Sequence, residues 1–192
     1  SLPNIDDFPV SETPLKLLFE CLDEMNVIHL VNHALFDERI VLISENISLL
    51  NACAEAIRVL MYPFSWTHVY IALLPNQLSD MLQAPVPYLL GLHVDLKDCI
   101  YSHNNNDESN PIVVVDLDLG TLSHAPRNQF KFPMGEATRL CKAIKQLLKP
   151  DAFQYTYLQI EPTSIKMSDD SQVNRRLREL FVTFFANIVG SI

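Results

Sequence analysis

The order of hydrophobic and polar positions along the chain predicts alternating helices and strands. Apolar residues recur at helical spacing over 15–25, 47–61 and 137–148, which is typical of amphipathic helices packed on a core. A continuous, β-branched run at 39–44 predicts a strand covered on both faces. The complete set of expected helices is 15–25, 27–36, 47–61, 76–83, 137–148 and 173–189, and the expected strands are 39–44, 68–74, 88–92 and 112–118.

Local signals set the ends of several of these elements. Thr13 followed by Pro14 offers a hydroxyl cap and a proline at the first helical position. Asn26 is expected to cap the second helix, and Pro63 to end the third. Phe64, Trp66 and Tyr70 are expected to be buried where the second strand meets its helices.

Strands that alternate with helices favour a parallel arrangement. We therefore expect an α/β fold with a mostly parallel central sheet and helices on both faces, in three layers. The 192 residues suit one domain with a substantial core.

Composition and charge exclude several classes of protein. The chain is 48% hydrophobic and 19% charged, which argues against a disordered tail or a coiled coil. Its net charge of −9 disfavours binding to nucleic acid through general electrostatics. No apolar run is long enough to cross a bilayer. The four cysteines are far apart and form no C-x-x-C pair, so we interpret them as reduced core residues, not a zinc site or disulfide framework.

Two patterns resemble catalytic or metal-binding motifs. His29 and His33 lie four residues apart on one expected helix, a spacing that can share a metal, but no third ligand sits at a suggestive spacing. The run VVVDLDLGTL resembles the D-x-D-G-T-L motif of haloacid-dehalogenase-type phosphatases, with Asp116 as nucleophile and Asp118 as acid/base beside magnesium. Leu119 is inserted before Gly120, however, and the strand comes fourth in place of first. The alternative is a buried strand whose aspartates cap a turn.

Other enzyme signatures are missing from the sequence. There is no phosphate-binding glycine-rich loop and no G-x-S-x-G elbow, and the whole chain has four glycines. We expect no cofactor and no covalent catalysis.

Three consecutive blocks resemble the central part of the DENN domain. They are an E-R-R-I-type strand, a YPF-x-W-x-H-hydrophobic-Y-I-P-x-L-P block, and an L-x-D-x-L-x-A-P-x-P-[FY]-L-hydrophobic-G-hydrophobic-H block. The matching residues are Glu38, Arg39, Ile40, Tyr62, Pro63, Phe64, Trp66, His68, Tyr70, Ile71, Leu74, Pro75, Leu78, Asp80, Leu82, Ala84, Pro85, Pro87, Tyr88, Leu89, Gly91 and His93. The strand VVVDLDLG follows as in the family, and LRELFVTFFANIVG resembles its downstream helix. Ala72 departs from the family, which usually has proline there.

The resemblance implies a division of the chain. Residues 1–14 would be a linker from a preceding lobe, and 15–192 the C-terminal lobe of the DENN module. Within that lobe, 15–120 would be the central and 121–192 the downstream subregion. The missing partner would be an N-terminal longin-like lobe of the same protein.

The resemblance also implies guanine-nucleotide exchange on Rab-type small GTPases, with no covalent bond made or broken. Such a protein binds the nucleotide-free GTPase best, moves its switch regions and lowers the barrier to GDP release. It would be cytoplasmic, with trafficking membranes as a further location and no transmembrane segment. The alternative is a DENN-fold scaffold that binds a GTPase or another protein without exchange.

Turns at strand ends are expected to touch the GTPase, because buried strand residues cannot reach a partner. The candidate contacts are Ser44, Glu45, Asn46, His68, Asp80, Pro85 and Tyr88. Structural roles compete with this reading: Asn46 could cap a helix, Asp80 could be a solvated helix residue, and Pro85 could stiffen the chain.

Overall fold

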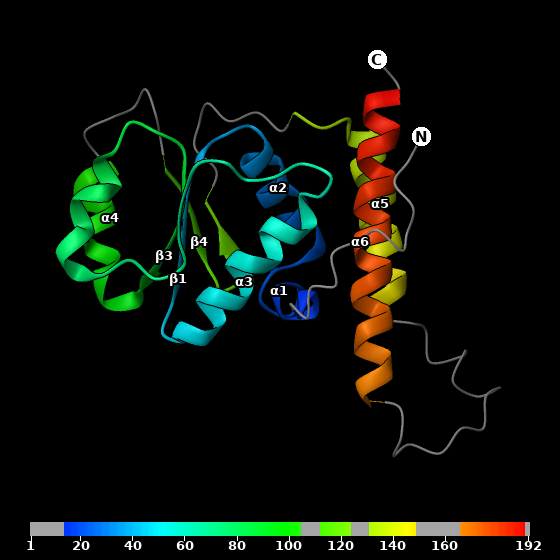
Figure 1. The fold of residues 1–192 in the computed structure, drawn as a ribbon, viewed down its shortest axis with the longest axis horizontal. Coiled ribbons are helices and arrows are strands. Elements are labelled where there is room, and N and C mark those ends of the chain that lie inside the picture. Colours follow the sequence, from blue (N-terminus) through cyan, green and yellow to red (C-terminus); the bar gives the residue numbers. More distant parts are fainter. Residues whose placement is uncertain (1–13, 105–111, 124–130, 149–165, 191–192) are drawn as a thin grey trace.

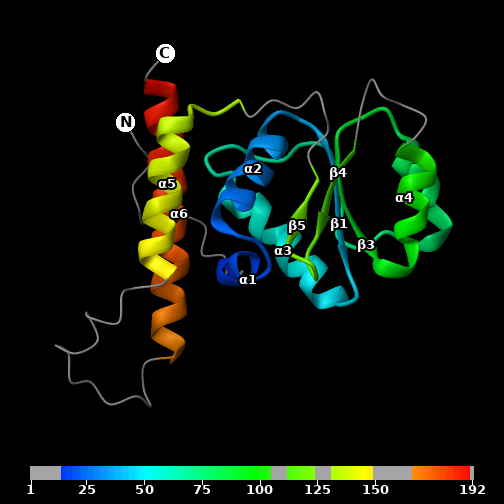
Figure 2. The same cartoon turned by 180° about the vertical axis from the view of Figure 1, so that it is seen from behind.

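A mixed sheet of five strands forms the centre of the molecule. The computed structural model describes residues 14–104, 112–123, 131–148 and 166–190, and Figures 1 and 2 show the fold from two sides. The strands are β1 (Arg39–Ser44), β2 (Val69–Ile71), β3 (Tyr88–His93), β4 (Ile112–Asp116) and β5 (Thr121–Leu122), in the order β2-β3-β1-β4-β5. The first four are parallel and only β5 pairs antiparallel.

Helices cover both faces of this sheet. On one face lie α1 (Leu15–Cys21), α2 (Glu24–Leu35) and α3 (Ile47–Leu60), and the other face carries η2 (Asn76–Gln83), η3 (Val94–Leu96) and α4 (Lys97–Asn104). The long pair α5 (Met134–Leu148) and α6 (Lys166–Gly190) packs side by side against α1, α2 and α3 (Figures 1 and 2). The expected α/β architecture with a mostly parallel sheet is confirmed.

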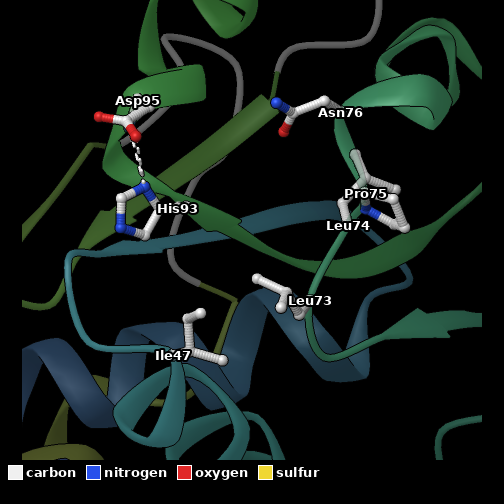
Figure 3. Close-up of a pocket in the computed structure, with 7 residues that line it drawn as sticks. All are labelled: Ile47, Leu73, Leu74, Pro75, Asn76, His93 and Asp95. Carbon is white, nitrogen blue, oxygen red and sulfur yellow. Dashed lines mark hydrogen bonds and ion pairs between the residues drawn. The ribbon is translucent and has the colours of Figure 1, made fainter.

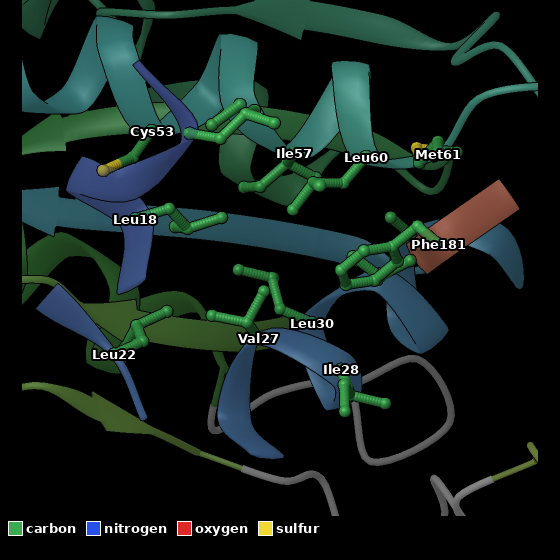
Figure 4. Close-up of a cluster of buried hydrophobic side chains, with 14 of the residues drawn as sticks. Leu18, Leu22, Val27, Ile28, Leu30, Cys53, Ile57, Leu60, Met61 and Phe181 are labelled. Atoms are coloured by element: carbon green, nitrogen blue, oxygen red, sulfur yellow. The ribbon is translucent and has the colours of Figure 1, made fainter. Parts of the chain in front are cut away.

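The continuous apolar character of β1 follows from its two covered faces. All six of its residues are buried. Ile40 and Leu42 face a large cluster shared with α1, α2, α3, α5 and α6, while Val41 and Ile43 face a smaller cluster beside α4 and η2. Figure 4 shows the large cluster, where Phe181 of α6 joins Leu30 of α2 and Ile57 of α3. The core therefore continues from the sheet through its helices into α6.

The start of α2 differs from the expected one. Asp23, not Asn26, is the cap, since its carboxylate accepts the backbone N–H of Asn26 at 2.7 Å. The side chain of Asn26 donates to the same carboxylate at 2.9 Å. Leu22 between α1 and α2 is extended, so the chain turns there and begins a new helix at Glu24. The helical spacing that continues to Met25 in the sequence thus spans two helices.

Several other element boundaries also differ from those expected from the sequence. The second strand covers only Val69–Ile71 of the expected 68–74, and the fourth ends at Asp116. The 3₁₀ helix η3, α4 and the short β5 were not expected, and α6 begins before the expected 173. The expected cap Thr13 and all of the expected linker except Pro14 lie outside the described residues. Of the helices in the described ranges, none has the length and apolar character needed to cross a bilayer.

Candidate functional site

The parallel strands bring polar side chains together where they end. Ser44 ends β1, His93 ends β3 and Asp116 ends β4. In an open parallel sheet, this carboxyl edge is the usual place for binding sites. We refer below to the ends of these strands and the turns that follow them as the carboxyl edge.

Asp118 fixes the turn between β1 and α3. Its carboxylate accepts the hydroxyl of Ser44 at 2.7 Å and the backbone N–H of Glu45 at 2.8 Å. Ser44 Oγ in turn accepts the N–H of Asn46 at 2.9 Å, and Asn46 Oδ1 accepts the N–H groups of Ser48 and Leu49. The turn is therefore held at both ends, by Asp118, which follows the neighbouring strand β4, and by the cap of α3.

Asp116 performs a similar task for α4. Its side chain is nearly buried and lies 2.7 Å from the Lys97 ammonium at the start of that helix. It also accepts the backbone N–H of Leu119 at 3.0 Å. Burial by itself raises the pKa of Asp116, but the hydrogen bonds from Lys97 and Leu119 outweigh it, and the pKa lies below its ordinary value.

The stability supplied by Asp116 should depend on pH. Because its folded pKa is depressed, the carboxylate stabilises the fold above its unfolded pKa of about 3.9, and that contribution is lost as the pH falls through the folded pKa. We expect Asp116→Asn to lower the free energy of unfolding by about 2 kcal/mol at pH 7. The difference from the wild type should shrink as the pH falls below about 4. Urea unfolding of both proteins from pH 7 down to the acid limit measures this, and a constant difference would contradict the depressed pKa.

The same bonds argue against phosphatase chemistry. A nucleophilic Asp116 and an acid/base Asp118 would have to face a substrate. Here Asp116 pairs with Lys97, and Asp118 holds the β1–α3 turn. Both aspartates therefore act as turn and helix anchors, which is the structural alternative considered from the sequence.

A hollow of about 300 Å³ opens beside the fixed turn (Figure 3). Its apolar walls come from the start of α3 and from the segment after β2, and its rim is polar. The lining residues are Ile47, Leu73, Leu74, Pro75, Asn76, His93 and Asp95. Ile47 and Leu73 remain 51% and 38% exposed, an uncommon state for large apolar side chains placed side by side around one hollow.

The structure divides the expected contact residues between two edges of the sheet. Glu45 and Asn46 are exposed at the carboxyl edge, and Ser44 beneath them is fully buried. His68 and Pro85 precede β2 and β3, so they lie at the opposite, amino edge, and Asp80 is exposed on η2.

At the amino edge, His68 lies 2.9 Å from the Asp37 carboxylate. Tyr88, the first residue of β3, is fully buried, and its hydroxyl donates to the carbonyl of Leu82 at 3.0 Å. Burial raises the pKa of Tyr88 to about 12. Tyr88 therefore supports the turn before β3 from inside and does not form part of the surface.

The aromatic residues before and within β2 are mainly architectural. Trp66 is buried, and its indole N–H donates to the carbonyl of Val69 at 3.1 Å. Tyr70 was expected to be buried but is only half-buried, and its hydroxyl donates to Glu55 at 2.7 Å. The prediction that Phe64 is buried is wrong. Its side chain is 44% exposed, and its ring lies edge-on to that of Phe185, with 5.5 Å between the ring centroids. It covers the outside of the core near α6 instead of entering it.

The possible metal pair on α2 is not assembled into a site. His33 is buried, with Nδ1 2.6 Å from the Glu38 carboxylate. Within the part of the chain that the structure describes, no three His, Cys, Asp or Glu side chains gather in a way that could hold a metal.

Sequence reasoning missed the residues that shape the carboxyl edge. For Asp118 the alternative that it caps a turn was considered, but the sequence did not show that this turn is the one between β1 and α3. Ile47 and Leu73 were seen only as helix and strand residues. Their shared hollow depends on the β1–α3 turn meeting the segment after β2, which no local pattern reveals.

Comparison with known proteins places this geometry in a family context. A family model described as the DENN (AEX-3) domain matches residues 1–120. The chain is 33% identical over 195 residues to DENN domain and WD repeat-containing protein SCD1 of Arabidopsis thaliana, covering 98% of this chain and 16% of that protein. It is 36% identical over 104 residues to human DENN domain-containing protein 1A, covering 54% and 10% respectively. With human DENN domain-containing protein 2C the identity is 26% over 186 residues, covering 96% and 18%. The chain therefore spans less than a fifth of each of these relatives.

Proposed function

Since this chain belongs to the DENN domain family, we propose that it serves guanine-nucleotide exchange on a Rab-type small GTPase, as the C-terminal half of a DENN module. Exchange needs a surface that binds one state of the GTPase better than another, and it needs no covalent chemistry. The observation that carries the proposal is the carboxyl edge. There a fixed turn and an apolar hollow are presented to a partner, while Asp116 and Asp118 are engaged in structural bonds.

The division of the chain belongs to the same proposal. Residues 1–14 would arrive from an N-terminal longin-like lobe, 15–120 would be the central subregion, and 121–192 the downstream one. The large buried cluster supports a single C-terminal lobe, because it combines Leu18 and Leu30 from the first part with Leu140 and Phe181 from the second. The missing half of the GTPase platform would come from the longin-like lobe.

Within this lobe, we assign the GTPase contacts to the β1–α3 turn. Glu45 and Asn46 are exposed there, and the bonds from Ser44 and Glu45 to Asp118 set their position. His68, Asp80 and Pro85 lie elsewhere on the surface and stay predictions. Tyr88 would act only through the turn that it supports.

The proposal is tested by the release of fluorescent GDP from a panel of Rab GTPases. The chain is assayed alone and joined to a longin-like lobe. We expect the two lobes together to accelerate release and to lower the affinity of the GTPase for GDP by about 5- to 150-fold, the range typical of coupling between sites. The chain alone should bind more weakly and release GDP slowly, because it offers half of the platform.

Two other outcomes would change the assignment. Binding of a Rab by the joined lobes without any effect on GDP release would favour a scaffold that assembles complexes. If the joined lobes neither bind any Rab of the panel nor accelerate its release of GDP, the proposed exchange function is overturned.

A further inference from the structure

We propose that the hollow at the carboxyl edge receives one aliphatic side chain of the GTPase, flanked by a lysine or arginine of the same protein. This inference rests on the exchange function proposed above and adds the chemistry of the contact. It assigns a binding role to Ile47, Leu73 and Asp95, none of which is among the contacts expected from the sequence.

The shape of the hollow favours a single aliphatic group. Its volume of about 300 Å³ is open to solvent. Ile47 and Leu73 lie next to each other in its lining, and Leu74 and Pro75 continue the lining beyond Leu73 (Figure 3). Large apolar side chains that surround a polar-rimmed depression are the arrangement found at the centre of protein interfaces. A leucine, isoleucine or valine side chain would cover Ile47 and Leu73 and remove them from water.

The charge around the hollow favours a basic neighbour for that group. Asp95 on the rim lies 3.1 Å from His93 Nδ1, and its side chain is still 82% exposed; Glu45 is exposed one residue before the cap of α3. Lys97, on the same edge, has its ammonium 2.7 Å from Asp116 and so offers less positive charge to the rim. With a net charge of −9 on the chain, an incoming lysine or arginine would be attracted and a carboxylate repelled.

The walls are held in place before any partner arrives. The turn that leads into Ile47 is fixed by Asp118 and by the Asn46 cap. The backbone N–H of Leu74 donates to the carbonyl of Gly91 at 2.7 Å, which ties the segment that carries Leu73 and Leu74 to β3. A preformed hollow loses little conformational freedom on binding, so more of the contact energy appears as affinity.

Ile47→Asp tests the wall without threatening the fold. Ile47 is the first residue of α3, where a negative charge interacts favourably with the helix dipole. We expect this change to weaken the binding of nucleotide-free GTPase to the joined lobes by about 30-fold, the size associated with an interface hot spot. Leu73→Asp, at the neighbouring position in the lining, should have a similar effect. Titration of each variant against the Rab that the wild type binds best gives the dissociation constants.

The chain offers a closely matched control for Ile47→Asp. Met134 is also a large exposed apolar residue, 62% exposed, and it is likewise the first residue of a long helix, α5. Met134→Asp should leave GTPase affinity unchanged. Thermal unfolding of all three variants confirms that each is folded, and sedimentation of each shows whether the hollow instead joins two copies of the chain.

Asp95→Lys tests the charge of the rim. We expect it to weaken GTPase binding and to reduce the dependence of association on salt. Replacement of the flanking lysine or arginine of the GTPase by glutamate should restore binding to the Asp95→Lys variant. The same replacement should weaken binding to the wild type.

The outcomes separate this inference from the function on which it rests. Suppose that the wild type binds a Rab and accelerates its GDP release, and that Ile47→Asp and Leu73→Asp bind this Rab as tightly as Met134→Asp does. The hollow is then not the contact, and the exchange function stands. If the wild type does neither with any Rab, both fail. Loss of self-association with unchanged GTPase binding would assign the hollow to a second copy of the chain and overturn the inference.

Discussion

Replacement of Gly91 by alanine is expected to lower the free energy of unfolding by about 3 kcal/mol or more, a large part of the stability of a typical domain. A Cβ atom at Gly91 would lie 2.0 Å from the carbonyl oxygen of Ala72 and 2.9 Å from its carbonyl carbon. Both are backbone atoms, so no side chain can rotate away. The strand can accept the methyl group only if the segment after β2 moves off β3, which breaks the bond from Leu74 to Gly91.

Urea unfolding of Gly91→Ala measures this cost, and Gly135→Ala is the control. Gly135 lies within α5 and nothing approaches its Cβ position within 4 Å. Alanine there should stabilise the chain by up to about 1 kcal/mol, because glycine in a helix loses more conformational freedom. A Gly91→Ala protein as stable as the wild type would contradict the close approach of Ala72 to β3.

Phe181→Ala should have the second large effect, with a loss of about 3–5 kcal/mol in the free energy of unfolding. The Phe181 side chain is 1% exposed and belongs to the same buried cluster as residues of α1, α2 and α3. Its ring also lies 6.2 Å from that of Phe185. Truncation leaves a cavity between α6 and the layer that covers the sheet, and the surrounding helices can close it only partly.

Val189→Ala is the control for this change, since Val189 lies on the same helix and is 61% exposed. It should alter the free energy of unfolding by no more than about 0.5 kcal/mol. Circular dichroism during urea unfolding should show one transition for each protein, shifted only for Phe181→Ala. Two separate transitions, with only one of them shifted, would mean that α5 and α6 unfold independently of the sheet.

The elements with the strongest hydrophobic pattern were predicted well. The strand at 39–44 was found because apolar residues on both of its faces meet a covered sheet. In α3, the inward positions Leu50, Cys53 and Ile57 are buried as their spacing predicts. Here local pattern and tertiary environment require the same structure.

Other features depended on competition between neighbouring residues. Asp23 and Asn26 are both good caps, and the sequence alone did not show that the chain would turn at Leu22 and use the first of them. The helix α4 was missed because its apolar spacing is weak and it starts directly after η3. Phe64 was expected inside because it is aromatic, but the core ends at Phe185 and leaves it half exposed.

For the site, the sequence located a turn but not its surroundings. The expectation that turns at strand ends touch a partner selected Ser44, Glu45 and Asn46. Of these, Glu45 and Asn46 are exposed at the carboxyl edge. The same reasoning selected Tyr88, whose side chain points into the smaller cluster because it belongs to the strand and not to the turn before it. Whether a strand-end residue faces solvent depends on which helices cover it, and that is a property of the assembled fold.

The short strands at the two ends of the sheet have a consequence for assembly. An edge strand offers unpaired backbone groups to any other chain, and a long apolar edge is a template for aggregation. Here the fully buried strand β1 and the largely buried strand β3 are interior, while the sheet ends in β2 with three residues and β5 with two. Edges this short give an incoming strand little to pair with. Association through an added strand is therefore disfavoured, and the most aggregation-prone segments stay shielded inside the sheet.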